Sequence, residues 1–150
     1  MARIIAYPSV TPVVGDCLVG TQKTTSGNQT NPTKNFTVGD VVNAGLGYTV
    51  YAALVSQAGT AAPVVTELKN NTGATFTWTR FAVGQYRAQT NISVFTANKT
   101  VGIFTNGQTI QLNTVAERLS DTFYQLETAI GSVLSDDFLS NGYLEIRIYS

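Results

Sequence analysis

Apolar and polar residues alternate along most of the chain after residue 46, in short runs separated by turn residues. In 74–80, Phe76 and Trp78 fall on one face and threonines on the other, and in 143–149 aliphatic residues alternate with Glu145 and Arg147. A period of two is typical of half-buried β-strands, because successive side chains of a strand point to opposite faces. Strands are therefore predicted over 48–57, 63–69, 74–80, 85–90, 100–105, 108–117, 121–130 and 143–149.

Turn signals recur between these runs, such as Asn-Asn-Thr-Gly at 70–73 and Asn-Gly at 141–142. Seven or eight short strands over about 105 residues match the size and spacing of an antiparallel β-sandwich. A helix over 115–135 is an alternative, since apolar residues there approximate a helical stripe. The β-branched and aromatic content of that stretch and Gly131 disfavour it. The predicted fold is all-β, with two layers.

The first 45 residues differ from the rest of the chain, because their sequence has little means of forming a hydrophobic core. A nearly wholly polar stretch at 22–34 predicts an exposed loop, and 16–21 is expected to pair with 34–38 as a two-stranded ribbon. A ribbon of two strands is only marginally stable in water, so this segment is expected to be an arm that docks on another molecule. Asp40 is expected to cap a short helical turn over 41–44 that Gly45 ends. The predicted organisation is an arm, 1–45, followed by a sandwich, 46–150.

Composition narrows the function classes. The 150 residues contain nine Lys+Arg and nine Asp+Glu, and the charged share of 12% is about half the usual one. A surface this poor in charge is expected to face other protein. The basic residues are scattered singly, which disfavours nucleic-acid binding, since phosphate contacts need clustered Lys and Arg. No segment approaches the length of a membrane span, and residues 1–14 lack the apolar region of a signal peptide, so we expect no membrane association and folding in a cytoplasm.

Candidate catalytic and metal-binding groups are few. The chain has no histidine, which excludes Ser-His-Asp and Cys-His catalysis. The lone Cys17 is expected to be a small, half-buried side chain, with an intermolecular disulfide as the alternative. Asp136 and Asp137 are adjacent, so their side chains point to opposite faces in an extended chain. We therefore expect a turn with solvated acidic side chains here and not a calcium site. A carboxylate hydrolase would need acids such as Glu117, Asp121 and Glu127 to converge. We predict a protein that is not an enzyme and holds no cofactor or metal.

A module that binds a host-surface glycan, as a receptor-binding or adhesion domain does, is the alternative function that the aromatic residues suggest. Sugars stack on exposed rings and hydrogen-bond to neighbouring polar groups, and Tyr86, Arg87, Tyr143 and Tyr149 are the candidate contacts. Most of the seven Tyr, seven Phe and one Trp are nevertheless expected in the core or an interface, because aromatic rings supply much of the burial in a small sandwich.

Two N-terminal segments, 7–21 (YPSVTPVVGDCLVGT) and 33–42 (TKNFTVGDVV), are distinctive. Together they resemble an N-terminal element of virion structural proteins from tailed bacteriophages, including crAss-like and marine phages. In those proteins a P-x-x-GD-x-L-x-G-T stretch, a variable polar spacer and a T-K-N-F-T-V-G-D-I/V stretch precede a small β-domain. The distal runs at 48–54, 96–100 and 144–149 are similar to such domains, so the resemblance touches nearly the whole chain.

The resemblance implies a capsid-bound fibre, decoration protein or tail-associated subunit, assembled into the virion in the host cytoplasm. It implies a homo-oligomer, with a trimer favoured, and partners among the major capsid or tail proteins of the particle. The arm would add strands to a neighbouring protein, with main-chain hydrogen bonds giving affinity and alternate apolar side chains giving register. The expected anchors are Tyr7, Leu18, Val19, Phe36 and Val38.

Overall fold

The structure is a computed structural model that describes residues 11–21, 33–106 and 112–149. The chain divides into two compact units, Met1–Gly47 and Tyr48–Ser150, and each is described by itself. The boundary expected between residues 45 and 46 lies within the last turn of helix α1 (Val38–Leu46). None of the described residues belongs to a helix with the length and apolar character needed to cross a membrane.

The N-terminal unit contains the predicted two-stranded ribbon. Strands β1 (Cys17–Thr21) and β2 (Thr33–Thr37) pair antiparallel, and the register runs from Cys17 opposite Thr37 to Thr21 opposite Thr33. This confirms the pairing of 16–21 with 34–38, except that Val38 belongs to the helix that follows. The backbone N–H of Val38 donates to the carbonyl of Asp16 at 2.9 Å, which closes the ribbon at its base.

Helix α1 (Val38–Leu46) corrects the expectation of a short turn over 41–44. Its N-cap is Thr37, whose hydroxyl accepts from the backbone N–H of Asp40, while the Asp40 carboxylate accepts from the backbone N–H of Thr37. This capping box satisfies two backbone donors and starts the helix one turn earlier than predicted. The helix ends at Gly47 (φ 67°) rather than Gly45, and Gly47 adopts the left-handed conformation that favours glycine at a C-cap.

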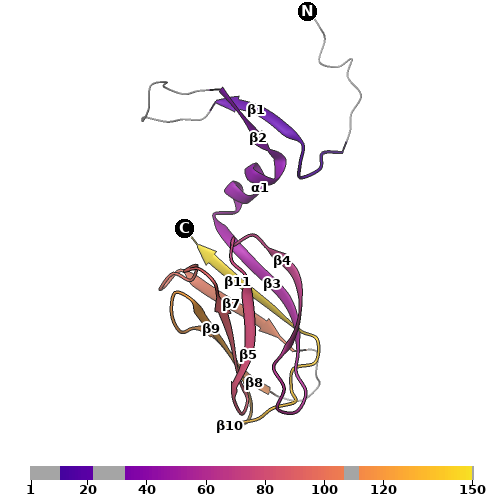
Figure 1. Ribbon diagram of the computed structural model, residues 1–150, viewed down its shortest axis with the longest axis vertical. Coiled ribbons are helices and arrows are strands. Elements are labelled where there is room, and N and C mark those ends of the chain that lie inside the picture. The colour runs from indigo at the N-terminus through magenta and orange to yellow at the C-terminus, as the bar shows by residue number, and fades with distance from the viewer. Residues whose placement is uncertain (1–10, 22–32, 107–111, 150) are drawn as a thin grey trace, which may run out of the picture. The chain divides into compact units, whose positions relative to one another are not determined.

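The second unit is an antiparallel β-sandwich, as predicted (Figure 1). One sheet has the strand order β4–β3–β11–β7. In the other sheet, β9 pairs with β6, β8 and β10, and β6 also pairs with β5. The two sheets contain four and five strands among the described residues. The strands are β3 (Tyr48–Ser56), β4 (Val64–Asn70), β5 (Phe76–Ala82), β6 (Gln85–Thr90), β7 (Thr100–Thr105), β8 (Leu112–Arg118), β9 (Phe123–Ile130), β10 (Val133–Leu134) and β11 (Gly142–Tyr149).

The strand assignment excludes the alternative helix over 115–135, because β8, β9 and β10 occupy that stretch. The two-residue strand β10 was not predicted. It pairs with the end of β9 across a turn in which Gly131 has φ 60°, and a run of two residues carries no alternation that could be detected. Residues 108–111 of the predicted strand 108–117 lie outside the described residues.

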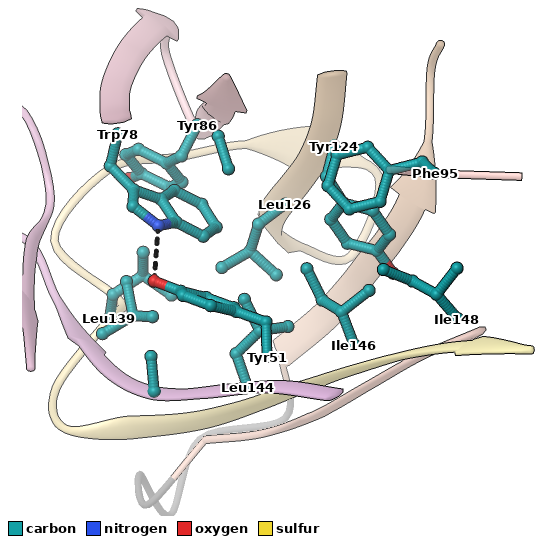
Figure 2. Packing of buried hydrophobic residues seen from close by; sticks show 13 residues of the cluster. Tyr51, Trp78, Tyr86, Phe95, Tyr124, Leu126, Leu139, Leu144, Ile146 and Ile148 are labelled. Carbon is teal, nitrogen blue, oxygen red and sulfur yellow. Dashed lines mark hydrogen bonds between the residues drawn. The ribbon is translucent and has the colours of Figure 1, made fainter. Parts of the chain in front are cut away.

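The core lies between the two sheets and is built from the predicted alternating positions (Figure 2). Trp78 is buried while Thr77 and Thr79 beside it are exposed, and the aliphatic residues of β11 point inward. The indole N–H of Trp78 donates to the hydroxyl of Tyr51 at 3.2 Å, so one buried polar group satisfies another. Because large aromatic and aliphatic side chains fill the space between the sheets, this unit has its own hydrophobic core.

Candidate functional site

The N-terminal unit has apolar side chains but no core of its own. Among its described residues, 11–20 and 33–47, none is buried. Its large apolar residues that remain exposed are Val13, Val14, Leu18, Val19, Val41, Val42 and Leu46. A soluble chain seldom exposes so many apolar side chains within so short a segment unless another molecule covers them.

The predicted anchors fall on two faces of the ribbon. Leu18 lies directly opposite Phe36, so these two side chains share one face. The Phe36 ring lies against Gly20, where an added Cβ would be 3.2 Å from the ring, so the glycine makes room for it. Val19 lies opposite Asn35 on the other face and is 75% exposed. Val38 is half-buried in the first turn of α1, and Tyr7 lies outside the described residues.

Cys17 is exposed, so the expectation of a half-buried side chain is wrong. It lies opposite Thr37 at the first residue of β1, in a unit none of whose described residues is buried. The alternative use of Cys17, an intermolecular disulfide, stays a prediction.

The four candidate glycan contacts do not form one surface. Tyr86 is completely buried in the core, so its ring cannot stack on a sugar, and it is removed from the candidate set. Arg87 lies on β6, where its guanidinium carbon is 3.3 Å from the centre of the Phe81 ring and its Nε donates to Gln125. Tyr143 and Tyr149 both lie on β11, in the other sheet.

The acidic side chains do not converge on one site. Glu117, Asp121 and Asp137 are exposed, Asp121 pairs with Arg118, and Glu127 accepts from two glutamine amides. Among the described residues, no group of three or more acidic or cysteine side chains is placed to hold a metal ion. Asp136 and Asp137 form no joint site, because Asp136 turns toward Arg80 and Asp137 accepts from the backbone of Gly59.

A partly buried polar network centres on the Asp136 carboxylate, at the end of the sandwich where β3 leads into β4. Arg80 donates to it from Nε and from a terminal nitrogen, the latter at 2.7 Å. The backbone N–H of Gly84 and the hydroxyl of Tyr86 donate to the same carboxylate at 3.0 and 3.1 Å. The Tyr86 hydroxyl also lies 2.9 Å from Oε1 of Gln57. The network holds the segment after β10 against β3, β5 and β6.

The ionisation of this network follows from its contacts. The hydrogen bond from Arg80 is the main cause that holds the pKa of the Asp136 carboxyl below its usual value, while burial acts in the opposite direction. Burial is the main cause that raises the pKa of Tyr86 to about 12. At neutral pH the carboxylate is therefore charged and the phenol neutral, which is the combination that lets Tyr86 donate. Sequence patterns gave no signal for this network, because Arg80 and Asp136 are 56 positions apart.

An acid titration tests this network. Because the pKa of Asp136 is lower in the folded than in the unfolded protein, the carboxylate stabilises the fold above its unfolded pKa, and this stabilisation is lost as the pH falls through the folded pKa. We expect Asp136→Asn to lower the thermal unfolding midpoint at pH 7, and the gap from wild type to shrink as the pH falls toward 3. A gap that stays constant from pH 7 to pH 3 would contradict the role of the charge. Asp137→Asn, in the adjacent exposed position, is the control.

Two of the hollows on the described surface of the sandwich are bordered by polar side chains that are mostly paired already. The larger, about 420 Å³, is bordered by Ser56, Gln57, Val64, Asp137 and Ser140. The Ser56 hydroxyl is bonded to Asn141, and Asp137 and Gln57 belong to the contacts above. The smaller, about 220 Å³, is bordered by Arg118 and Asp121, which pair with each other.

The exposed apolar surface of the N-terminal unit is therefore the feature of the described chain that most needs a functional explanation. No protein-family model, curated protein or solved structure matches the chain.

Proposed function

We propose that the chain is a non-enzymatic structural component of a bacteriophage virion, whose N-terminal unit docks on a capsid or tail protein. The observation that carries the proposal is that no described residue of that unit is buried, although seven large apolar side chains among those same described residues are exposed. The two segments that resemble virion proteins, 7–21 and 33–42, lie in the same unit. The partner supplies the core that this unit lacks.

The backbone of the ribbon supports the same role. Within the described residues, β1 and β2 pair only with each other, so each keeps one strand edge for a further strand. Strand addition gives affinity through main-chain hydrogen bonds, and side chains at alternate positions set the register. Leu18 with Phe36 on one face, and Val19 on the other, would enter pockets of the partner. The sandwich would then form the oligomeric, projecting or decorating part, with a trimer favoured.

A matched pair of variants tests the docking role. Burying one valine or leucine side chain contributes about 1.5–3 kcal/mol, which corresponds to about 10- to 100-fold in affinity. We expect Val19→Lys to reduce incorporation into purified particles by about tenfold or more, with an unchanged unfolding midpoint of the sandwich. Val133→Lys, at an equally open position of β10 (68% exposed against 75%), should be incorporated like wild type. Full occupancy by Val19→Lys and by Leu18→Lys would overturn the proposal.

The glycan-binding alternative has less support, because Tyr86 is buried and the remaining three candidates lie on two different sheets. Binding of the protein to a glycan array tests this alternative. Binding stronger than about millimolar that is lost in Arg87→Ala would restore this function.

A further inference from the structure

The register of the ribbon determines which of its main-chain groups face outward. In an antiparallel pair, facing residues that bond to each other alternate with facing residues whose N–H and C=O groups point away. Val38 follows Thr37 in the chain, and its N–H donates to the carbonyl of Asp16, which precedes Cys17. The facing residues 16 and 38 are therefore a bonded pair, and every second pair along the ribbon bonds in the same way. The outward main-chain groups belong to the pairs between, which are Cys17, Val19 and Thr21 on β1 and Thr33, Asn35 and Thr37 on β2.

The open edge of β2 is interrupted where α1 begins. Thr37 holds one of its three outward N–H groups, and this group donates to the Asp40 carboxylate at 3.3 Å in the capping box. Lys34 also gives β2 a charge, and a lysine on an edge strand disfavours pairing with a further strand. β1 contains no charged residue. It therefore offers a further strand more outward main-chain groups than β2 does, without a charge beside them.

The edge strands of the sandwich carry features that prevent the addition of a further strand. Charged residues lie in β4, β5 and β8, the pairings of β4 with β3 and of β5 with β6 contain register shifts, and β10 has two residues. β7 has no charged residue, but β8 lies beside it, and an added Cβ at Gly102 would be 3.2 Å from the Cβ of Ala116. The open edge of β1 is thus the one strand edge of the described residues that shows none of these features.

The side chains of β1 indicate what kind of strand fits this edge. Leu18 and Phe36 form a row on one face, and a further strand would place its own residue next to Leu18 in a non-bonded pair, where side chains lie closest. Val19 is exposed on the other face and would lie in a bonded pair. Apolar residues at both positions would cover these side chains, whereas a charged residue would find no opposite charge on β1. The strand that fits is therefore an extended, uncharged segment with apolar side chains on both faces.

A second copy of the chain matches this edge less well than a different protein does. If two copies of β1 paired antiparallel with Val19 facing Val19, each Leu18 would face a Gly20. Glycine brings no side chain to cover Leu18. A strand from a different protein is free to present a large apolar side chain at that position.

We infer that the open edge of β1, and not that of β2, receives an extended apolar strand of the capsid or tail protein on which the N-terminal unit docks. The inference rests on the proposed function and deepens it, because it names the contacting edge and the chemistry of the segment that is bound. Main-chain bonds from Cys17, Val19 and Thr21 hold the strand, and the side chains of Leu18 and Val19 set its register.

Proline substitutions at Val19 and Asn35 make a matched test, because these residues face each other and both N–H groups point outward. Proline removes the N–H and is tolerated on an edge strand where that group faces solvent, so the bonds between β1 and β2 stay in place. The bound strand would then keep a carbonyl without its donor. We expect Val19→Pro to reduce incorporation into purified particles by about tenfold or more, and Asn35→Pro to be incorporated like wild type. An NMR contact between the α-protons of Cys17 and Thr37 establishes that each variant keeps the ribbon.

Amide hydrogen exchange of the wild-type chain gives a second measurement that needs no variant. Assembled particles are exposed to heavy water and dissolved under conditions that stop exchange, and the free full chain is treated alongside. We expect the Val19 amide to exchange about tenfold or more slowly in the particle than in the free chain, and the Asn35 amide to exchange alike in both.

Each contrary result overturns the inference in a recognisable way. Full incorporation of Val19→Pro would exclude the edge of β1, and equal losses in Val19→Pro and Asn35→Pro would remove the distinction between the edges. Protection of the Val19 amide in the free chain would mean that the chain fills its own edge, or that a second copy does if protection rises with concentration. Full incorporation of Val19→Pro while Val19→Lys is excluded would leave the docking proposal in place. Full occupancy by Val19→Lys and Leu18→Lys is the result that overturns the docking proposal itself.

Discussion

Gly84→Ala is expected to destabilise the sandwich by about 2–5 kcal/mol, a large part of the stability of a domain of this size. Gly84 has φ 63°, which a residue with a side chain adopts only with strain. An added Cβ would lie 2.5 Å from the carbonyl oxygen of Thr128 and 2.6 Å from the backbone nitrogen of Ser135. Both obstacles are main-chain atoms, and a hydrogen bond of 3.0 Å joins them to each other, so neither can move without breaking it.

Gly131→Ala is the matched control for this prediction. Gly131 has φ 60°, but an added Cβ would meet nothing within 4 Å, so only the cost of the left-handed conformation, about 1 kcal/mol, is expected. Free energies of unfolding from urea titrations of the two variants separate the steric contribution from the conformational one. Equal losses in the two variants would show that Gly84 is not tightly packed in solution.

Gly102→Ala is expected to destabilise the fold by about 3 kcal/mol, with a different physical cause. Gly102 lies in β7, and an added Cβ would lie 1.6 Å from the hydroxyl oxygen of Tyr124 and 3.2 Å from the Cβ of Ala116. The Tyr124 ring is buried and packs on Phe95, so it has little room to turn away. The glycine therefore makes the space in which the tyrosine hydroxyl lies.

A double-mutant cycle with Tyr124→Phe checks this explanation. The Tyr124 hydroxyl is buried without a hydrogen-bond partner among the described residues, and burial raises the pKa of this phenol. Its removal is expected to be neutral or stabilising by about 1 kcal/mol. The double variant should recover more than about 1 kcal/mol of the loss caused by Gly102→Ala, because the closest clash is gone. Strict additivity of the two changes would contradict the proposed contact.

Tyr86→Phe is the comparison for Tyr124→Phe. Tyr86 and Tyr124 are buried alike, but the hydroxyl of Tyr86 contacts Gln57 and Asp136. Its removal leaves a carboxylate oxygen with one partner fewer, and a loss of about 1–3 kcal/mol is expected. Measured side by side, the two Tyr→Phe variants show whether hydrogen bonding rather than ring packing distinguishes the two tyrosines.

The fold was predicted closely where one face of a strand is buried. In β11, the alternation of Leu144, Ile146 and Ile148 with charged residues determines both the strand and its inward side, and the structure confirms both. The helix over 38–46 was underestimated because its signal depends on a reciprocal contact between Thr37 and Asp40, not on Asp40 alone. Tyr86 was misjudged as a surface ring, although Gln85, Arg87 and Gln89 alternate with it and indicate that it lies on the inward face of β6.

The ribbon between 16–21 and 34–38, the all-β class and the strands of the sandwich other than β10 can be predicted from the amino-acid pattern, because these follow from spacings of two to about twenty residues along the chain. Which strands are neighbours depends on how the chain packs in three dimensions. Those adjacencies bring Arg80 to Asp136, Gly102 to Tyr124, and the outward aliphatic residues of β3 and β7 to the two sides of β11. Such contacts join residues that no local period relates, since a strand's alternation records whether its faces are wet or dry and not which strand lies beside it.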